Sequence, residues 1–233
     1  MEGVVILLDK IKNGLVVSCQ ALPDEPLHSP YIMGKMAYAV SEGGASGIRA
    51  NGGVDIIEIK KQTNLPIIGI VKCDYPDSAV YITATMKEIE ELAVTGCEMI
   101  AIDATDTQRP KGESIEEFIK KVRERVPNTL LMADIATLEE AVRAEKLGFD
   151  CVSTTLIGYT EQTKGLNIAD NDFSILKEIV AALNVPVIAE GNVNTPQKAK
   201  RCLDIGALSI VVGSAITRPK WITERFIKAI NEE

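Results

Sequence analysis

Aromatic residues and histidine are scarce in this chain of 233 residues. Phe, Trp and Tyr together make up 4% of it, whereas hydrophobic residues make up 46%. The core must therefore consist of Val, Ile, Leu and Ala, which is typical of buried parallel strands. His28 is the single histidine. It cannot supply the paired histidines of metal-dependent barrel epimerases, so we expect no bound metal.

Basic runs, CxxC pairs and long apolar segments are also missing. The net charge is −8, and no Lys/Arg-rich run carries interleaved aromatics, which argues against nucleic acid or an anionic membrane as partner. No segment reaches the length of a membrane span, and the first residues predict a short amphipathic helix that closes the barrel bottom. Isolated cysteines predict buried free thiols in a reducing cytoplasm. These are Cys19, Cys73, Cys97, Cys151 and Cys202.

Eight short apolar runs alternate with helix-period stretches along the whole chain. The runs are 15–19, 47–50, 67–71, 99–103, 129–134, 151–155, 187–190 and 209–213. The helical stretches between the later runs include 85–96, 114–126, 137–148 and 172–183, and capping boxes are expected at Ser114/Glu117 and Thr137/Glu140. This alternation is the pattern of a parallel α/β sheet.

Proline and glycine mark the strand entries with a regular spacing. Runs three, five and seven follow prolines, and the even runs follow helix-ending glycines: Pro66, Pro127 and Pro186, then Gly44, Gly96, Gly148 and Gly206. The repeat predicts a single (β/α)8 TIM barrel domain over residues 1–233. An open doubly wound sheet is the alternative, and the lack of GxGxxG after the first run weakens it.

Two turns of small residues follow the seventh and eighth runs. Gly191-Asn192 and Gly213-Ser214 each end an apolar strand, at the place where barrels commonly hold a phosphate. Backbone N–H groups from two neighbouring turns can converge on one anion. We therefore predict a phosphate site at these four residues.

Polar residues at the other strand ends point to the chemistry, because barrel sites form at the carboxyl ends of the strands. Lys72 closes the third run, where an apolar stem and partial burial would make it a general base. Glu190 closes the seventh run, four strands away and hence on the opposite wall. The pair predicts proton removal from one face of a carbon and return to the other. Further substrate contacts are predicted at Gln20, Arg49, Asp134, Thr154 and Arg218.

Eight sequence blocks in register resemble one family, the N-acetylmannosamine-6-phosphate (N-acylglucosamine-6-phosphate) 2-epimerases. The blocks are VSCQALPDEPLHSP, GIRANG, GIVKCDY, DATDTQRP, MADIAT, STTLIGYT, AEGNVNTPQ and VVGSAITRP. They cover residues 15–219 in order. The resemblance implies a ribulose-phosphate-binding type barrel that acts in sialic acid breakdown in the bacterial cytoplasm.

The same resemblance implies a reaction and its residues. N-acetyl-D-mannosamine 6-phosphate would be inverted at C2 to N-acetyl-D-glucosamine 6-phosphate without a cofactor. Lys72 and Glu190 match the family's catalytic lysine and glutamate, and Arg49 and Asp134 match its other polar positions. It also implies a homodimer. The alternatives are a Schiff-base aldolase, an aldose–ketose isomerase, or a non-catalytic sensor of phosphorylated sugars.

Overall fold

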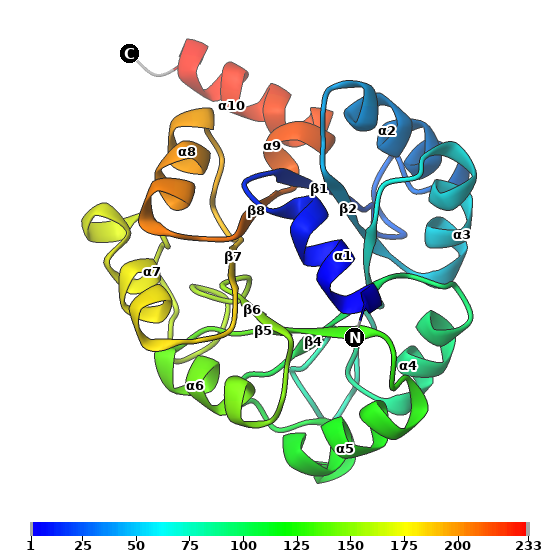
Figure 1. Cartoon of the computed structure of the whole chain (residues 1–233). Coiled ribbons are helices and arrows are strands. Elements are labelled where there is room, and N and C mark those ends of the chain that lie inside the picture. The colour runs from blue at the N-terminus through cyan, green and yellow to red at the C-terminus, as the bar shows by residue number, and fades with distance from the viewer. Residues whose placement is uncertain (1, 232–233) are drawn as a thin grey trace.

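A closed ring of eight parallel strands forms the centre of the computed structural model, which describes residues 2–231 (Figure 1). Each strand pairs with the next along the chain, and β8 pairs with β1 through Leu15 and Ile210. The strands are β1 (Leu15–Cys19), β2 (Gly47–Asn51), β3 (Ile67–Ile70), β4 (Met99–Asp103), β5 (Leu130–Asp134), β6 (Cys151–Ser153), β7 (Val187–Ala189) and β8 (Ser209–Val212). The predicted (β/α)8 barrel is confirmed, and the open sheet was the wrong alternative.

Helices surround this ring on the outside (Figure 1). The helices of the described residues are α1 (Glu2–Ile11), α2 (Pro30–Glu42), α3 (Gly53–Gln62), α4 (Met86–Ala93), α5 (Ile115–Arg125), α6 (Leu138–Lys146), α7 (Asp170–Ala182), α8 (Pro196–Ile205), α9 (Ser214–Thr217) and α10 (Pro219–Asn231), with a 3₁₀ turn at Pro110–Gly112, and α2 to α8 form the outer layer. The four predicted helical stretches correspond to α4, α5, α6 and α7 within a few residues.

Alternation of side chains along each strand divides the core into two layers. One set packs inside the barrel and includes Val16, Ile70 and Met132, together with Leu7 and Ile11 of α1. The other set faces outward and packs against the helices. Helix α1 lies across one end of the ring, as predicted (Figure 1). That end is closed, so the cavity of the molecule must lie at the other.

The helix ends and helix starts have most of the backbone conformations and capping hydrogen bonds that their residues predict. The four glycines that precede even strands all have φ in the left-handed region, as a helix end requires: Gly44, Gly96, Gly148 and Gly206. At α6, Thr137 accepts from the N–H of Glu140 and Glu140 bonds back, which completes the expected capping box. At α5, Ser114 accepts from the N–H of Glu117, so only this half of the second box is present.

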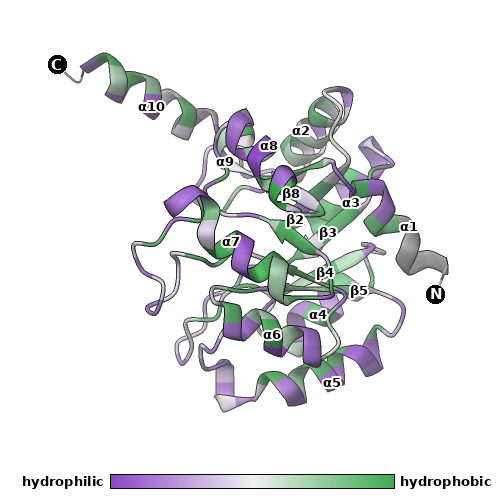
Figure 2. Cartoon of the chain, turned by 60° about the vertical axis from the view of Figure 1, so that its left-hand side comes forward, coloured by the Kyte–Doolittle hydropathy of each residue, from purple (hydrophilic) through white to green (hydrophobic). Residues whose placement is uncertain are grey.

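Helix α10 extends away from the barrel (Figure 2). It has no buried residue, and Phe226, Ile227 and Ile230 are exposed. Among residues 2–231 no helix is long and apolar enough to cross a membrane. Four of the cysteines are buried free thiols as expected, and Cys73 is half-buried.

Candidate active site

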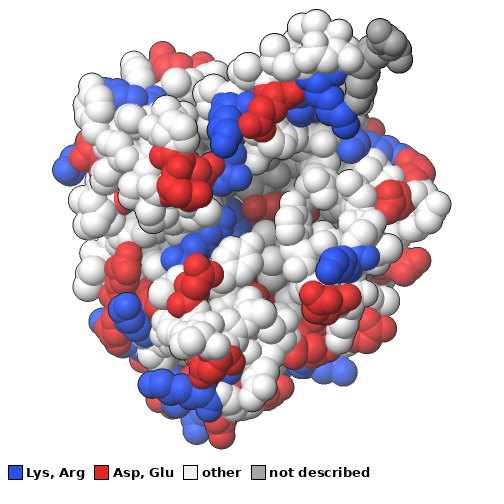
Figure 3. All heavy atoms as spheres, turned by 180° about the vertical axis from the view of Figure 1, so that it is seen from behind, with Lys and Arg blue, Asp and Glu red and all other residues white. Residues whose placement is uncertain are grey.

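A cavity of about 300 Å³ opens at the carboxyl ends of the strands. Figure 3 looks onto this face, which is hollowed near its centre, with Lys and Arg side chains beside the hollow. The structure brings most of the predicted site residues to this cavity. They are Gln20, Arg49, Lys72, Glu190, Gly191, Asn192, Gly213, Ser214 and Arg218.

Lys72 lies two residues beyond the end of β3. Its backbone N–H donates to Asn51 Oδ1 over 2.8 Å, and it pairs with Ile82 on the returning segment of the loop. The ammonium Nζ lies 5.9 Å from the centroid of the Tyr81 ring. Burial, together with the positive charges of Arg49 and Arg218, lowers the pKa of Lys72 to about 8. A lysine in this state supplies a neutral amine near physiological pH.

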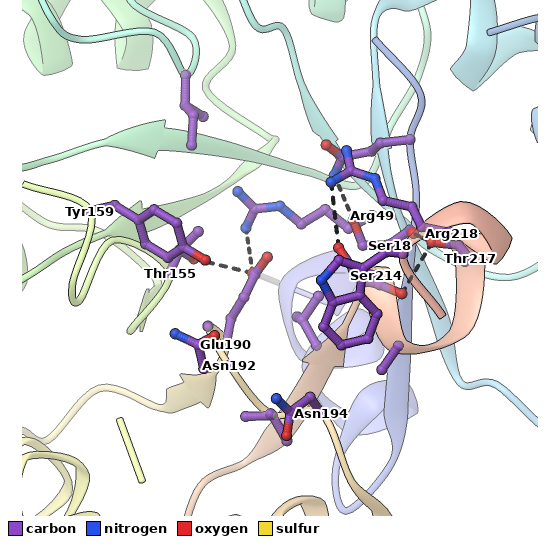
Figure 4. Close-up of a pocket in the computed structure, with 18 of the residues that line it drawn as sticks. Ser18, Arg49, Thr155, Tyr159, Glu190, Asn192, Asn194, Ser214, Thr217 and Arg218 are labelled. Atoms are coloured by element: carbon purple, nitrogen blue, oxygen red, sulfur yellow. Dashed lines mark hydrogen bonds and ion pairs between the residues drawn. The ribbon is translucent and has the colours of Figure 1, made fainter. Parts of the chain in front are cut away.

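Arg49 connects two carboxylates, those of Asp134 and Glu190, at the base of the cavity, and Figure 4 shows its contact with Glu190. Its Nη1 donates to Asp134 Oδ1 over 3.0 Å and to Glu190 Oε2 over 2.8 Å. Its Nη2 donates to Asp134 Oδ2 over 2.5 Å. Arg49 and Asp134 are almost wholly buried, with 1% and 0% of their side chains exposed. Desolvated ion pairs of this kind hold a fixed geometry, so Arg49 orients the Glu190 carboxyl.

The Glu190 side chain is 14% exposed and lines the cavity. Burial raises the pKa of Glu190, and the neighbouring Arg49 guanidinium partly offsets that rise. The Glu190 carboxyl therefore stays protonated up to a higher pH than the carboxyl of an exposed glutamate does. Strands β3 and β7 are four apart in the closed ring, so Lys72 and Glu190 approach the cavity from opposite walls.

Two of the predicted substrate contacts lie outside the cavity. Asp134 is covered completely and pairs with Arg49, because it ends β5 beneath the cavity floor. Thr154 is also buried, and its hydroxyl bonds to the backbone N–H and C=O of Glu190. The sequence predicts that both touch the substrate. In the structure Asp134 contacts Arg49, and Thr154 contacts the backbone of Glu190.

Thr155 occupies the position that the sequence analysis assigns to Thr154. Its Oγ1 donates to Asp134 Oδ1 over 2.7 Å and lies 3.1 Å from Glu190 Oε2. The strand alternation could have identified it, since Cys151 faces the barrel interior and residues two apart share a face. Thr155 therefore points inward with Cys151, while Thr154 points outward.

The two predicted phosphate turns lie at one side of the cavity. Gly191 and Asn192 both have φ in the left-handed region, 95° and 56°, which turns the chain sharply after β7. Arg218 lines the same side, where its Nη1 donates to Ser214 Oγ over 3.4 Å and its Nη2 to Glu25 over 3.0 Å. It is therefore both a cavity residue and a member of an ion pair.

Several cavity residues were not identified from the sequence. They are Tyr81, Tyr159, Asn194, Thr217 and Trp221. Tyr81, Tyr159 and Asn194 lie on loops, where no periodicity shows which side chain turns inward. Ser18, which the sequence places at the end of the first strand, also lines the cavity, because it lies two residues after Val16 and shares the inward face of β1. It accepts a hydrogen bond from Gln20 Nε2 over 2.7 Å.

The described residues contain no group of three or more His, Cys, Asp or Glu side chains placed to hold a metal ion. What the cavity does contain is an amine, a carboxyl with a raised pKa and a rigid guanidinium beside two glycine-containing turns. This combination in a (β/α)8 barrel defines the class of the protein: an acid–base site suited to a phosphorylated substrate.

Comparison with known proteins identifies the family within that class. A family model described as "Putative N-acetylmannosamine-6-phosphate epimerase" matches residues 33–232. A relative from Enterobacter sp. (strain 638), named "Putative N-acetylmannosamine-6-phosphate 2-epimerase", is 58% identical over 224 residues, which is 96% of this chain and 95% of that protein. One from Oceanobacillus iheyensis is 59% identical over 221 residues, which is 95% of this chain and 100% of that protein.

A solved structure agrees with these relatives. The N-acetylmannosamine-6-phosphate 2-epimerase from Clostridium perfringens matches with a TM-score of 0.90 and 56% identity, covering 95% of each chain. The chain belongs to the N-acetylmannosamine-6-phosphate epimerase family. The family suggested by the sequence blocks is thereby confirmed.

Proposed function

We propose that this protein inverts C2 of N-acetyl-D-mannosamine 6-phosphate to give N-acetyl-D-glucosamine 6-phosphate. Membership of the family supports this reaction. The observation that carries it is the placement of Lys72 and Glu190 on opposite walls of one cavity, with a lowered and a raised pKa respectively. Inversion needs a base on one face of C2 and an acid on the other.

Lys72 acts as the base toward the mannosamine epimer. In the open-chain aldehyde the C2 hydrogen is acidified by the adjacent carbonyl. The neutral Lys72 amine takes this proton, and the electron pair of the C–H bond moves into an enolate at C1–C2. Arg49 lines the cavity in an orientation fixed by its contacts with Asp134 and Glu190, and its guanidinium stabilises the negative charge that develops on the enolate.

Glu190 returns a proton to the opposite face. Its carboxyl gives a proton to C2, the enolate closes back to the aldehyde, and the configuration is inverted. The cycle leaves an ammonium on Lys72 and a carboxylate on Glu190, and exchange with solvent restores both. In the reverse direction the ionised Glu190 removes the proton and the Lys72 ammonium supplies one.

Binding of the phosphate orients the sugar between these two groups. Gly191, Asn192, Gly213 and Ser214 line one side of the cavity, with Arg218 beside them. With C6 held there, C2 lies between the two walls, and fixed placement of reactants lowers the barrier. Gln20, which also lines the cavity, is placed to bind a sugar hydroxyl. No step requires a cofactor, so activity should survive treatment with a chelator.

Turnover of N-acetylmannosamine 6-phosphate in heavy water, followed by ¹H NMR, tests the proposal. We expect the C2 proton signal to be absent from the product, because solvent deuterium enters at C2. A sensor would bind the sugar without exchange. An aldolase would form an imine on Lys72 that borohydride traps as a stable adduct. Either of these results would replace the proposed epimerase.

Three further properties belong to this proposal. The whole chain acts as one barrel domain, since its eight strands share one ring. The protein works in the cytoplasm in sialic acid catabolism, where reduced thiols and a phosphorylated sugar are expected. It forms a homodimer, and the exposed Phe226, Ile227 and Ile230 of α10 offer an apolar surface for a second copy. Light scattering should give twice the chain mass.

A further inference from the structure

Arg109 is a buried arginine in the loop after β4, and 4% of it is exposed. Its Nη1 donates to the carbonyl oxygen of Asp103 over 2.6 Å. Its Nη2 donates to the carbonyl oxygens of Thr83 and Ala84 over 3.0 and 2.9 Å. The guanidinium carbon lies 4.1 Å from the centroid of the Phe118 ring on α5. Arg109 therefore joins the end of β4 to the segment that returns after β3.

The charge of Arg109 is kept in this buried place at a cost, because a guanidinium loses the solvation of water there. Burial lowers the pKa of Arg109 to about 10, so the side chain is still charged at neutral pH. Among the described residues its two Nη groups donate to backbone carbonyls only, and its Nε has no partner. What the buried charge supplies is therefore a fixed link between two stretches of backbone.

One of the carbonyls that Arg109 holds belongs to a strained residue. Thr83 is buried and has a φ of 50°, in the left-handed region that β-branched residues rarely adopt. Such a conformation is unfavourable and persists only where its surroundings impose it. The N–H of Thr83 donates to the carbonyl of Val71 over 2.8 Å, and its Oγ1 accepts from the N–H of Val71 over 3.3 Å. Arg109 supplies a further contact, at the carbonyl of Thr83.

The strained residue lies at the base of the loop that carries Lys72. Lys72 directly follows Val71 and pairs with Ile82, which directly precedes Thr83. The loop of residues 71–83 is thus closed at its base by the two hydrogen bonds between Val71 and Thr83. A shift of Thr83 would therefore move Lys72 with it.

We propose that Arg109 is a positioning residue, whose guanidinium holds the base of the 71–83 loop against β4 and so fixes Lys72 at the cavity. This inference rests on the proposed function, in which the Lys72 amine removes the C2 proton. Arginine suits the task because its planar fork binds several carbonyls in a fixed geometry. A lysine in its place would keep the charge but would bring a single nitrogen to the carbonyls of both segments.

The place of Lys72 sets the pH range in which its amine is neutral. Charged or titratable groups face it from several elements: Arg49 of β2, Asp134 of β5, Glu190 after β7, Arg218 after α9 and, on its own loop, the Tyr81 ring. Burial and the two arginines lower the pKa of Lys72 to about 8, whereas the two carboxylates raise it. If the loop loosens, water reaches the amine and its pKa rises toward the ordinary value of 10.5. Loss of the Arg109 contacts should therefore leave less neutral amine at pH 7.

Arg109→Lys tests this role through the pH profile of C2 exchange. Exchange of N-acetylmannosamine 6-phosphate with heavy water is followed by ¹H NMR from pH 6 to pH 10. The midpoint should move upward and exchange at pH 7 should fall about tenfold, because a midpoint one pH unit higher leaves about a tenth as much neutral amine. The amides of Cys73 and Thr83, which bond within the 71–83 loop, should exchange with solvent about tenfold faster or more.

Arg123→Lys is the matched control. Arg123 of α5 also donates to backbone carbonyls, those of Thr129 and Gly148, but these lie just before β5 and β6, at the closed end of the barrel. This variant should keep the wild-type midpoint and the wild-type exchange of the loop amides, even where its melting temperature falls.

Phe118→Leu is a milder variant that keeps Arg109 and removes the ring beneath its guanidinium. It should slow exchange at pH 7 by about threefold, and it decides the question if Arg109→Lys does not fold. A folded Arg109→Lys with the wild-type midpoint and loop amide exchange would overturn the positioning role while the epimerase stands, and so would a wild-type midpoint in Phe118→Leu where only that variant folds. Failure of the wild type to exchange C2 would overturn the proposed function, and this inference with it.

Discussion

Arg49→Met removes the guanidinium that joins Asp134 and Glu190. Asp134 has 0% of its side chain exposed, and both of its oxygens accept from Arg49. Without Arg49 the donor that remains to this carboxylate is the Thr155 hydroxyl. Loss of one partner from a buried ion pair costs about 3–5 kcal/mol, because a desolvated charge is left without compensation.

This loss should be visible in equilibrium unfolding. For a chain of this length each kcal/mol lowers the melting temperature by about 2–4 °C, so Arg49→Met should melt about 6–20 °C below the wild type. Urea unfolding followed by circular dichroism gives the free energy directly. Activity should also be lost, since Glu190 no longer has the contact that orients it.

The double variant Arg49→Met/Asp134→Leu separates the two effects. An apolar pair leaves no buried charge at this position, so most of the lost stability should return. Activity should stay absent, because Glu190 still lacks Arg49. If Arg49→Met alone unfolds like the wild type, or if the double variant regains activity, Arg49 neither compensates Asp134 nor orients Glu190 as proposed.

Three other predictions follow from particular contacts. With a pKa of about 8 for Lys72, the rate at which the mannosamine epimer exchanges its C2 proton with heavy water should rise from pH 6, where about 1% of the amine is neutral, to pH 8, where about half is, since this exchange needs only the neutral amine; a pH-independent exchange rate would contradict this. Thr155→Val removes a hydroxyl whose bond lowers the pKa of Glu190, so the ionisation that limits the reverse reaction should move to higher pH, and Thr155→Ser should restore it. Thr137→Ala should lower the free energy of unfolding by about 1 kcal/mol through loss of the α6 cap, with kcat unchanged; an unaltered urea midpoint would refute it.

The barrel could be predicted because its signals are local. Each strand is a short apolar run, and the entries to the second through eighth strands carry a proline or a left-handed glycine such as Gly206, whose φ is 113°. The placement of Lys72 and Glu190 could also be predicted, since they follow strands whose order fixes them on opposite walls.

The rest of the site depends on contacts that the sequence does not display. The pairing of Arg49 with Asp134 joins residues 85 positions apart, so their burial together could not be read from either strand. Tyr81 reaches the cavity because the loop after β3 folds back, with the N–H of Cys73 donating to its carbonyl over 3.0 Å. The sequence analysis chooses Thr154 rather than its neighbour Thr155 for a different reason, because β6 ends at Ser153 whereas the apolar run continues to residue 155 and hides where the strand stops.

Exchange of the C2 proton with heavy water in single variants tests the two-wall mechanism most directly. Lys72→Ala should still exchange N-acetylglucosamine 6-phosphate through Glu190 but should not exchange the mannosamine epimer. Glu190→Gln should show the opposite preference, and neither variant should interconvert the epimers. If one variant abolishes exchange of both epimers while the other keeps both, a single group handles both faces and the two-wall mechanism is contradicted.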